Sequence, residues 1–90
     1  MLKVIKRDGI IEDFNERKVR TSIENAAKDV GLALNYSDLK VISGDIIKVI
    51  SNLRKDSQVT STYEIIGVII SILKKDGFNK TLKAYLDFKK

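Results

Sequence analysis

The sequence predicts a small α+β domain, and three observations support this fold class. An Asp8-Gly9 pair separates two short, β-branched runs near the start of the chain, which is a strong signal for a β-hairpin. Apolar residues then recur at helical spacing in four later segments. The chain has 90 residues, of which 43% are hydrophobic, and contains no proline and no internal repeat. We therefore expect a single domain over residues 1–90.

The predicted hairpin carries an unusual number of charges beside its turn. A two-residue type I′ turn at Asp8-Gly9 would place Arg7 and Glu12 on one face of the hairpin. Lys6 and Asp13 would then share the opposite face. Neither face is apolar throughout, as the buried face of a simple core-covering hairpin would be. The charges could belong to a solvated edge or to a site for a charged ligand.

Two helices are predicted to follow the hairpin. Asn15 is a good N-cap for the first, and Gly31 supplies its stop. The second is expected to run from about Ser37 to about Lys55, with a buried apolar stripe. Residues 57–60 could then form a short third strand.

Two further helices complete the predicted elements. Ser61 and Glu64 have the spacing of a capping box at the start of a β-branched run. The length of this run and its Lys-Lys ending favour a buried helix over a strand. Asn79 is expected to cap a last helix that contains Leu82 and Tyr85.

The composition excludes several classes of function. The chain has no cysteine and no histidine, which rules out disulfides, thiolate zinc sites and the usual hydrolytic triads. The lack of cysteine fits a reducing compartment, so we expect a cytoplasmic location. The longest apolar run has nine residues, too few to cross a bilayer. Lys and Arg number 17 against 12 Asp and Glu, and the resulting charge of +5 favours anionic partners such as nucleotides, nucleic acid or acidic membrane.

Positive charge is concentrated around the start of the first helix. Arg17, Lys18 and Arg20 lie there, and Lys6 and Arg7 precede them in the hairpin. Cations at a helix start oppose the helix dipole, each by roughly 0.3–1 kcal/mol. The free N–H groups of that end favour an anion, and a triphosphate is a natural candidate. A solvated basic patch is the alternative interpretation.

Glu12 and Asn15 need a separate explanation, because a carboxylate repels phosphate. Glu12 could accept a hydrogen bond from the exocyclic amine of adenine, while Asn15 contacts a ring nitrogen. Alternatively, Glu12 could form a cross-strand ion pair with Arg7, worth roughly 0.2–1 kcal/mol, and Asn15 could serve only as the cap. Thr60 could likewise be no more than a strand end. The sequence contains no Walker loop, dinucleotide-binding glycine motif or metal-ligand cluster.

Both ends of the chain resemble one known family. The segment VIKRDGIIEDFNERKVRTSIENAA, residues 4–27, resembles the opening of the ATP-cone domain, whose usual form is V-x-K-R-D-G followed by phenylalanine and a basic helix. The final segment, LKAYLDFKK, resembles the closing helix of that domain. The resemblance spans nearly all 90 residues. It implies a four-helix bundle capped by a small three-stranded β-sheet, which agrees with the elements predicted above.

The resemblance also implies a function. ATP-cones are regulatory modules without catalytic activity, found at the N-terminus of ribonucleotide reductase large subunits and in the repressor of reductase genes. The expected effector is therefore ATP or dATP, with or without Mg²⁺. The expected partner is a reductase catalytic subunit or a second copy of the chain, controlled through changed association. The alternatives are an interaction module without nucleotide binding and a nucleic-acid-binding accessory domain. The scattered basic residues argue against the second alternative.

Eight residues acquire expected roles from the resemblance. Lys6 and Arg7 would face the phosphates, and Lys18 would lie along the ribose or phosphates. Glu12 and Asn15 would contact the adenine edge. Val4 would line the pocket, and Thr60, just before the third helix, would contact the sugar-phosphate. Lys90, at the end of the closing helix, would be the last of the nucleotide-binding residues.

Overall fold

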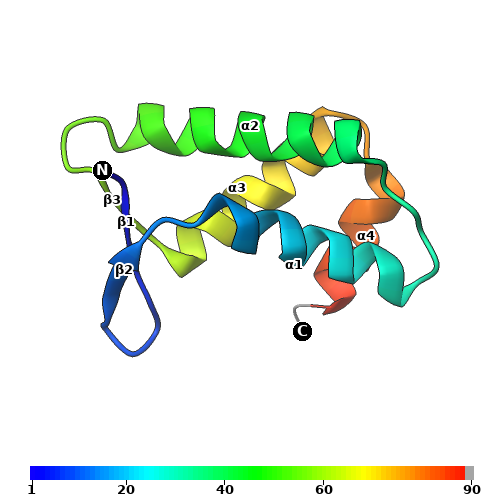
Figure 1. The fold of residues 1–90 in the computed structure, drawn as a ribbon, viewed down its shortest axis with the longest axis horizontal. Helices are drawn as coiled ribbons and strands as arrows, with labels where there is room; N and C mark the ends of the chain where they lie inside the picture. The colour runs from blue at the N-terminus through cyan, green and yellow to red at the C-terminus, as the bar shows by residue number, and fades with distance from the viewer. Residues whose placement is uncertain (89–90) are drawn as a thin grey trace.

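The computed structural model describes residues 1–88, and within them it has three strands and four helices (Figure 1). The strands are β1 (Lys3–Ile5), β2 (Ile11–Asp13) and β3 (Val59–Ser61). The helices are α1 (Glu16–Asp29), α2 (Tyr36–Leu53), α3 (Thr62–Lys75) and α4 (Asn79–Phe88). The predicted α+β class, with a four-helix bundle and a small three-stranded sheet, is confirmed.

The sheet is mixed and lies at one end of the helices (Figure 1). β1 is the central strand, antiparallel to β2 and parallel to β3. A parallel pair needs a long crossover connection, and here α1 and α2 provide it between β2 and β3. The hairpin and the start of α3 are therefore held side by side, although 45 residues separate β2 from β3 in the sequence.

The predicted register of the hairpin is wrong by one residue. Val4 lies opposite Glu12 in the structure, so residues 7–9 form a three-residue loop instead of a two-residue turn. Gly9 adopts φ +85°, the left-handed conformation that such three-residue loops place at their glycine. Arg7 consequently lies in the loop and does not share a strand face with Glu12, contrary to the prediction.

This shift also changes which residues of β1 and β2 share a face, because successive side chains of a strand point to opposite faces. The backbone N–H of Lys6 donates to the carbonyl of Ile10 at 2.9 Å and places Lys6 on the same face as Glu12. The predicted pairing of Lys6 with Asp13 on one face is therefore wrong. Asp13 lies on the outer face of the sheet, where its carboxylate forms an ion pair with Lys3.

The hydrophobic core lies between the helices. α1 and α3 each pack against both α2 and α4. The largest fully buried side chains are contributed by all four helices and are Ile23, Ile42, Ser43, Ile46, Ile50, Ile69, Leu73 and Tyr85. Within residues 1–88, no helix combines the length and the apolar character needed to cross a membrane.

Two of the three predicted helix caps are present in the structure. Asn15 caps α1 and Ser61 caps α3, as predicted. Asn79, in contrast, is the first residue of α4 and not its cap. The cap of α3 is only half of a capping box, since the Glu64 side chain bonds to Arg54 and Thr60 instead of returning to Ser61. This cap sets the entry of α3 directly beside the hairpin.

Candidate functional site

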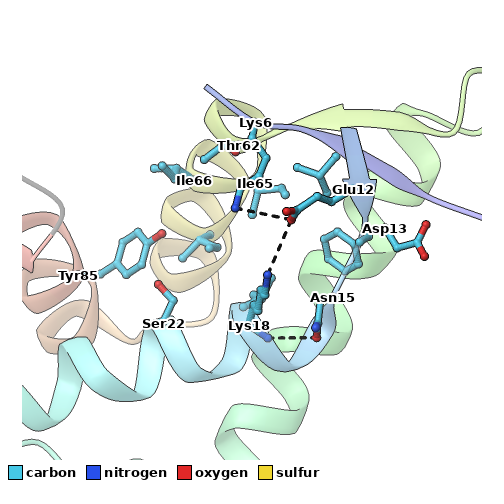
Figure 2. Close-up of a pocket in the computed structure, with 14 residues that line it drawn as sticks. Lys6, Glu12, Asp13, Asn15, Lys18, Ser22, Thr62, Ile65, Ile66 and Tyr85 are labelled. Atoms are coloured by element: carbon cyan, nitrogen blue, oxygen red, sulfur yellow. Dashed lines mark hydrogen bonds and ion pairs between the residues drawn. The ribbon is translucent and has the colours of Figure 1, made fainter. Parts of the chain in front are cut away.

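A cavity of about 180 Å³ lies between the inner face of the hairpin, α1 and α3 (Figure 2). Its charged groups gather at the hairpin end, and the hydroxyls of Tyr85 and Ser22 lie at the opposite end (Figure 2). The cavity is lined by Val4, Lys6, Glu12, Asp13, Phe14, Asn15, Lys18, Val19, Ser22, Thr62, Ile65, Ile66, Ile69 and Tyr85. It therefore combines apolar walls with a charged mouth.

Helical spacing explains how α1 and α3 supply the walls. Residues three, four or seven positions apart lie on one side of a helix. On α1 and its cap, this spacing aligns Asn15, Lys18 and Ser22 along the cavity. On α3, it aligns four residues of the first two turns, Thr62, Ile65, Ile66 and Ile69. The mouth is thus polar on the α1 side, and beyond Thr62 the α3 side is an apolar surface of three isoleucines.

The Glu12 carboxylate lies between two ammonium groups at the mouth. It is 3.6 Å from Nζ of Lys6 and 3.8 Å from Nζ of Lys18 (Figure 2). The three side chains are 42–68% exposed, so these ion pairs contribute only about 0–1 kcal/mol each. A ligand that offers a hydrogen-bond donor to Glu12 and a negative charge to the lysines could replace both pairs at little cost.

Asn15 has both a structural contact and a remaining donor. Its Oδ1 accepts hydrogen bonds from the backbone N–H groups of Arg17 at 3.0 Å and Lys18 at 3.4 Å. This arrangement is an N-cap, which typically contributes about 1 kcal/mol. Because the cap uses the carbonyl oxygen, the amide nitrogen is the atom that Asn15 can offer to a ligand, and it donates. An aromatic ring nitrogen is a suitable acceptor.

The size of the cavity limits what it can enclose. A dry cavity of roughly 150 Å³ in another protein accommodates benzene. The present cavity, at about 180 Å³, has room for a planar ring system between Val4 and the α3 isoleucines. It does not have room for an entire nucleotide, so a phosphate chain would lie outside the enclosed part.

The deep end of the cavity is neutral. Tyr85 is only 1% exposed, and its hydroxyl faces that of Ser22 (Figure 2). Burial raises the pKa of the Tyr85 phenol above its usual value, and the neighbouring Ser22 hydroxyl opposes this only partly. The phenol therefore stays uncharged at neutral pH. Among the described residues that line the cavity, none at this end is a cation, so phosphate is favoured at the mouth instead.

Five of the eight predicted residues line this cavity. They are Val4, Lys6, Glu12, Asn15 and Lys18. Arg7 does not line it, because its guanidinium lies 5.4 Å from the ring centre of Tyr63 on the outside of α3. This distance is typical of a cation–π contact. Lys90 lies outside the described residues.

Thr60 is the remaining predicted residue, and it is engaged elsewhere. It is 3% exposed, and its hydroxyl donates to Oε1 of Glu64 at 2.6 Å. Arg54 binds the same carboxylate through Nε and Nη2, at 2.9 and 2.7 Å. These contacts lower the pKa of Glu64, mainly through Arg54 and then through Thr60. Thr60 thus joins β3 to α3 and does not line the cavity.

The structure adds lining residues that sequence reasoning did not single out. They are mainly apolar or hydroxyl-bearing, and include Phe14, Ser22, Thr62, Ile65, Ile66 and Tyr85. Their helical spacing is the same as that of core residues, so the pattern alone could not separate a cavity wall from the core. One feature that could have identified lining residues is the position of Thr62 and Ile65 in the first turn of α3, directly after β3.

Comparison with known proteins gives one family match. Residues 2–90 match the family model described as the ATP cone domain. Such domains are nucleotide-binding allosteric regulatory modules that take ATP or dATP as effectors. No curated protein matches the chain. Within residues 1–88, no cluster of three or more acidic, cysteine or histidine side chains is arranged to hold a metal ion.

Proposed function

The chain belongs to the ATP-cone family, and on that premise we propose that residues 1–90 form one domain that binds ATP or dATP and thereby regulates a partner. The family is regulatory and not catalytic. The observation that carries the proposal is the position of Glu12, between Lys6 and Lys18 at the mouth of an apolar cavity. This mouth offers both an acceptor for a base and cations for phosphate.

Adenine fits the enclosed part of the cavity in this proposal. The ring lies between Val4 and the apolar side of α3, and its exocyclic amine donates to Glu12. The amide nitrogen of Asn15 donates to a ring nitrogen. Guanine has a carbonyl where adenine has the amine, so its oxygen would face the Glu12 carboxylate. The site should therefore prefer adenine nucleotides.

The phosphates then lie at the mouth. Lys6 and Lys18 exchange their weak contacts with Glu12 for charge-assisted hydrogen bonds to phosphate. Any Mg²⁺ would arrive on the phosphates. A contact from Arg7 would require its guanidinium to leave the Tyr63 ring, and a contact from Thr60 would disrupt its hydrogen bond to Glu64. We therefore include Lys6 and Lys18 as phosphate ligands and leave Arg7 and Thr60 out.

Regulation is proposed to act through association in the cytoplasm. Several cations around one cavity repel other copies of this +5 chain. A bound triphosphate of about −4 charge would neutralise much of this field. Association with a second copy, or with a reductase catalytic subunit, would then become easier. The sequence has no histidine or cysteine, and we expect the nucleotide to be bound without being consumed.

Calorimetric titration with ATP, dATP, GTP and inorganic tripolyphosphate tests this function. We expect ATP and dATP to bind at least about tenfold more tightly than GTP or tripolyphosphate, since only they satisfy both Glu12 and the lysines. Light scattering should show a higher mass with nucleotide, and a phosphate assay should show no steady release. Equal affinity for all four ligands would indicate a general basic patch and would refute the proposal.

A further inference from the structure

The cavity is adjacent to a second, more open hollow on the far side of Lys18. This hollow, of about 490 Å³, lies between α1 and the end of α4. It is lined by Asn15, Arg17, Lys18, Thr21, Ser22, Asn25 and Phe88. Asn15, Lys18 and Ser22 line both spaces. A ligand that begins in the cavity can therefore extend across Lys18 into the hollow.

The lining of the hollow is cationic. Arg17 and Lys18 contribute two positive charges, and among residues 1–88 no carboxylate lines it. At the mouth of the cavity, in contrast, Glu12 offsets part of the positive charge. The hollow is thus the more favourable of the two spaces for the terminal phosphates of a nucleotide.

Arg17 is available to bind an anion. Among the described residues, no carboxylate pairs with its guanidinium, whereas Arg54 is held by Glu64. Its side chain is exposed and lies one residue before Lys18, at the start of α1. The guanidinium of Arg7, in contrast, lies over the Tyr63 ring and lines neither space. Arg17 and Arg7 therefore mark two different routes for a phosphate chain.

We propose that the phosphate chain passes over Lys18 into the hollow, where Arg17 binds the β- and γ-phosphates. This inference rests on the proposed binding of the base in the cavity. A guanidinium presents paired N–H donors that match the oxygens of a phosphate. Thr21 and Asn25 lie one and two turns beyond Arg17 on the same side of α1 and add uncharged donors to the same space.

The test is a calorimetric series with adenosine, AMP, ADP and ATP. It compares the unmodified chain, Arg17→Gln and Arg7→Gln, which remove the same charge on the two alternative routes. We expect Arg17→Gln to lower the affinity for ATP and ADP by about tenfold. The affinity for AMP and adenosine should change by less than about twofold. Arg7→Gln should leave the whole series nearly unchanged.

Several outcomes would overturn this inference. A loss of ATP affinity in Arg7→Gln alone would place the phosphates along the hairpin, and equal losses in both variants would indicate a diffuse charge effect. Equal weakening of adenosine and ATP by Arg17→Gln would indicate a structural role. A stoichiometry of two ATP per chain, with Arg17→Gln removing only one, would make the hollow a separate site. Failure of the unmodified chain to bind adenosine or ATP would instead refute the proposed function itself.

Discussion

The carboxylate of Glu12 lies 3.6 Å from the ammonium group of Lys6, on the face of the hairpin that is turned toward α1 and α3 (Figure 2). An ion pair as exposed as this one contributes little to folding. The pair lies at the mouth of an apolar cavity, however, and there each partner can exchange its contact with the other for a contact with a ligand.

Replacing Glu12 with Gln should reduce the discrimination between ATP and GTP. The amide oxygen of Gln can still accept from adenine, but its NH₂ group can donate to the guanine carbonyl. A charge-assisted hydrogen bond also becomes a neutral one, so we expect the ratio of the two affinities to fall by about tenfold. Calorimetry with both nucleotides measures this ratio. Asp56→Asn, which removes an exposed charge in the loop before β3, serves as the control and should preserve it.

Replacing Lys6 with Ala should lower the affinity for ATP by about tenfold to a hundredfold, because a charge-assisted contact worth roughly 1.5–3 kcal/mol is lost. The free energy of unfolding without ligand should change by less than about 1 kcal/mol, since the contact with Glu12 is weak. The matched control is Lys48→Ala on α2, which removes the same charge from a helix that does not line the cavity. Normal ATP binding by the Lys6 variant would rule out this mouth as the phosphate site.

The sequence could predict most of the elements but not the register that forms the site. Asp8-Gly9 identifies the hairpin, yet the same pair suits a two-residue turn and a three-residue loop. The choice depends on contacts with distant residues, because Val4 must face α3 and pair with Thr60 of β3. The one-residue difference brings Lys6 and Glu12 onto one face, which no local pattern required.

The site residues divide in a similar way. Lys6, Glu12 and Lys18 were singled out through their resemblance to the family motif, and the concentration of charge beside the hairpin turn and the first helix start was the local signal. Ile65 and Ile66 could not, because an apolar residue at helical spacing indicates burial without saying what covers it. Arg7 was predicted through its motif, but its position over Tyr63 depends on a tertiary contact.

Replacing Gly9 with Ala should destabilise the chain by about 1 kcal/mol. Its φ of +85° is costly for a residue with a Cβ, although no atom lies within 4 Å of the position that the Cβ would take. Gly44 in α2 provides the opposite case, since its surroundings are equally open and its φ is not positive. Gly44→Ala should therefore stabilise by roughly 0.5–1 kcal/mol. Urea unfolding of both variants checks this pair, and a stable Gly9→Ala protein would contradict the loop geometry.

Replacing Asp76 with Asn should stabilise the chain at neutral pH. The pKa of Asp76 is raised, first by its hydrogen bond with Asp45, then by burial and by the charge of Asp45, while Lys75 opposes the shift. A carboxyl with a raised pKa in the folded state stabilises when protonated, and this contribution is lost as the pH rises through the folded pKa. Asp76 also stands at the C-terminal end of α3, where a negative charge is unfavourable.

The expected gain for Asp76→Asn is roughly 0.3–1 kcal/mol at pH 7, the range for one charge at a helix end. The gain should shrink toward zero near pH 3, at which the native carboxyl is largely protonated in both states. Urea unfolding at the two pH values measures the difference. A gain of the same size at both would show that the charge of Asp76 is not its cause.

The position of the base is the central claim, and nuclear Overhauser contacts between bound ATP and the methyl groups of the chain test it most directly. With ATP in excess, the adenine ring protons should show contacts to the methyl groups of Val4, Ile65 and Ile66, which line the cavity. They should show none to Leu32 and Leu34, which line a separate pocket after α1. Adenine contacts to Leu32 and Leu34, with none to Val4, Ile65 or Ile66, would contradict the account.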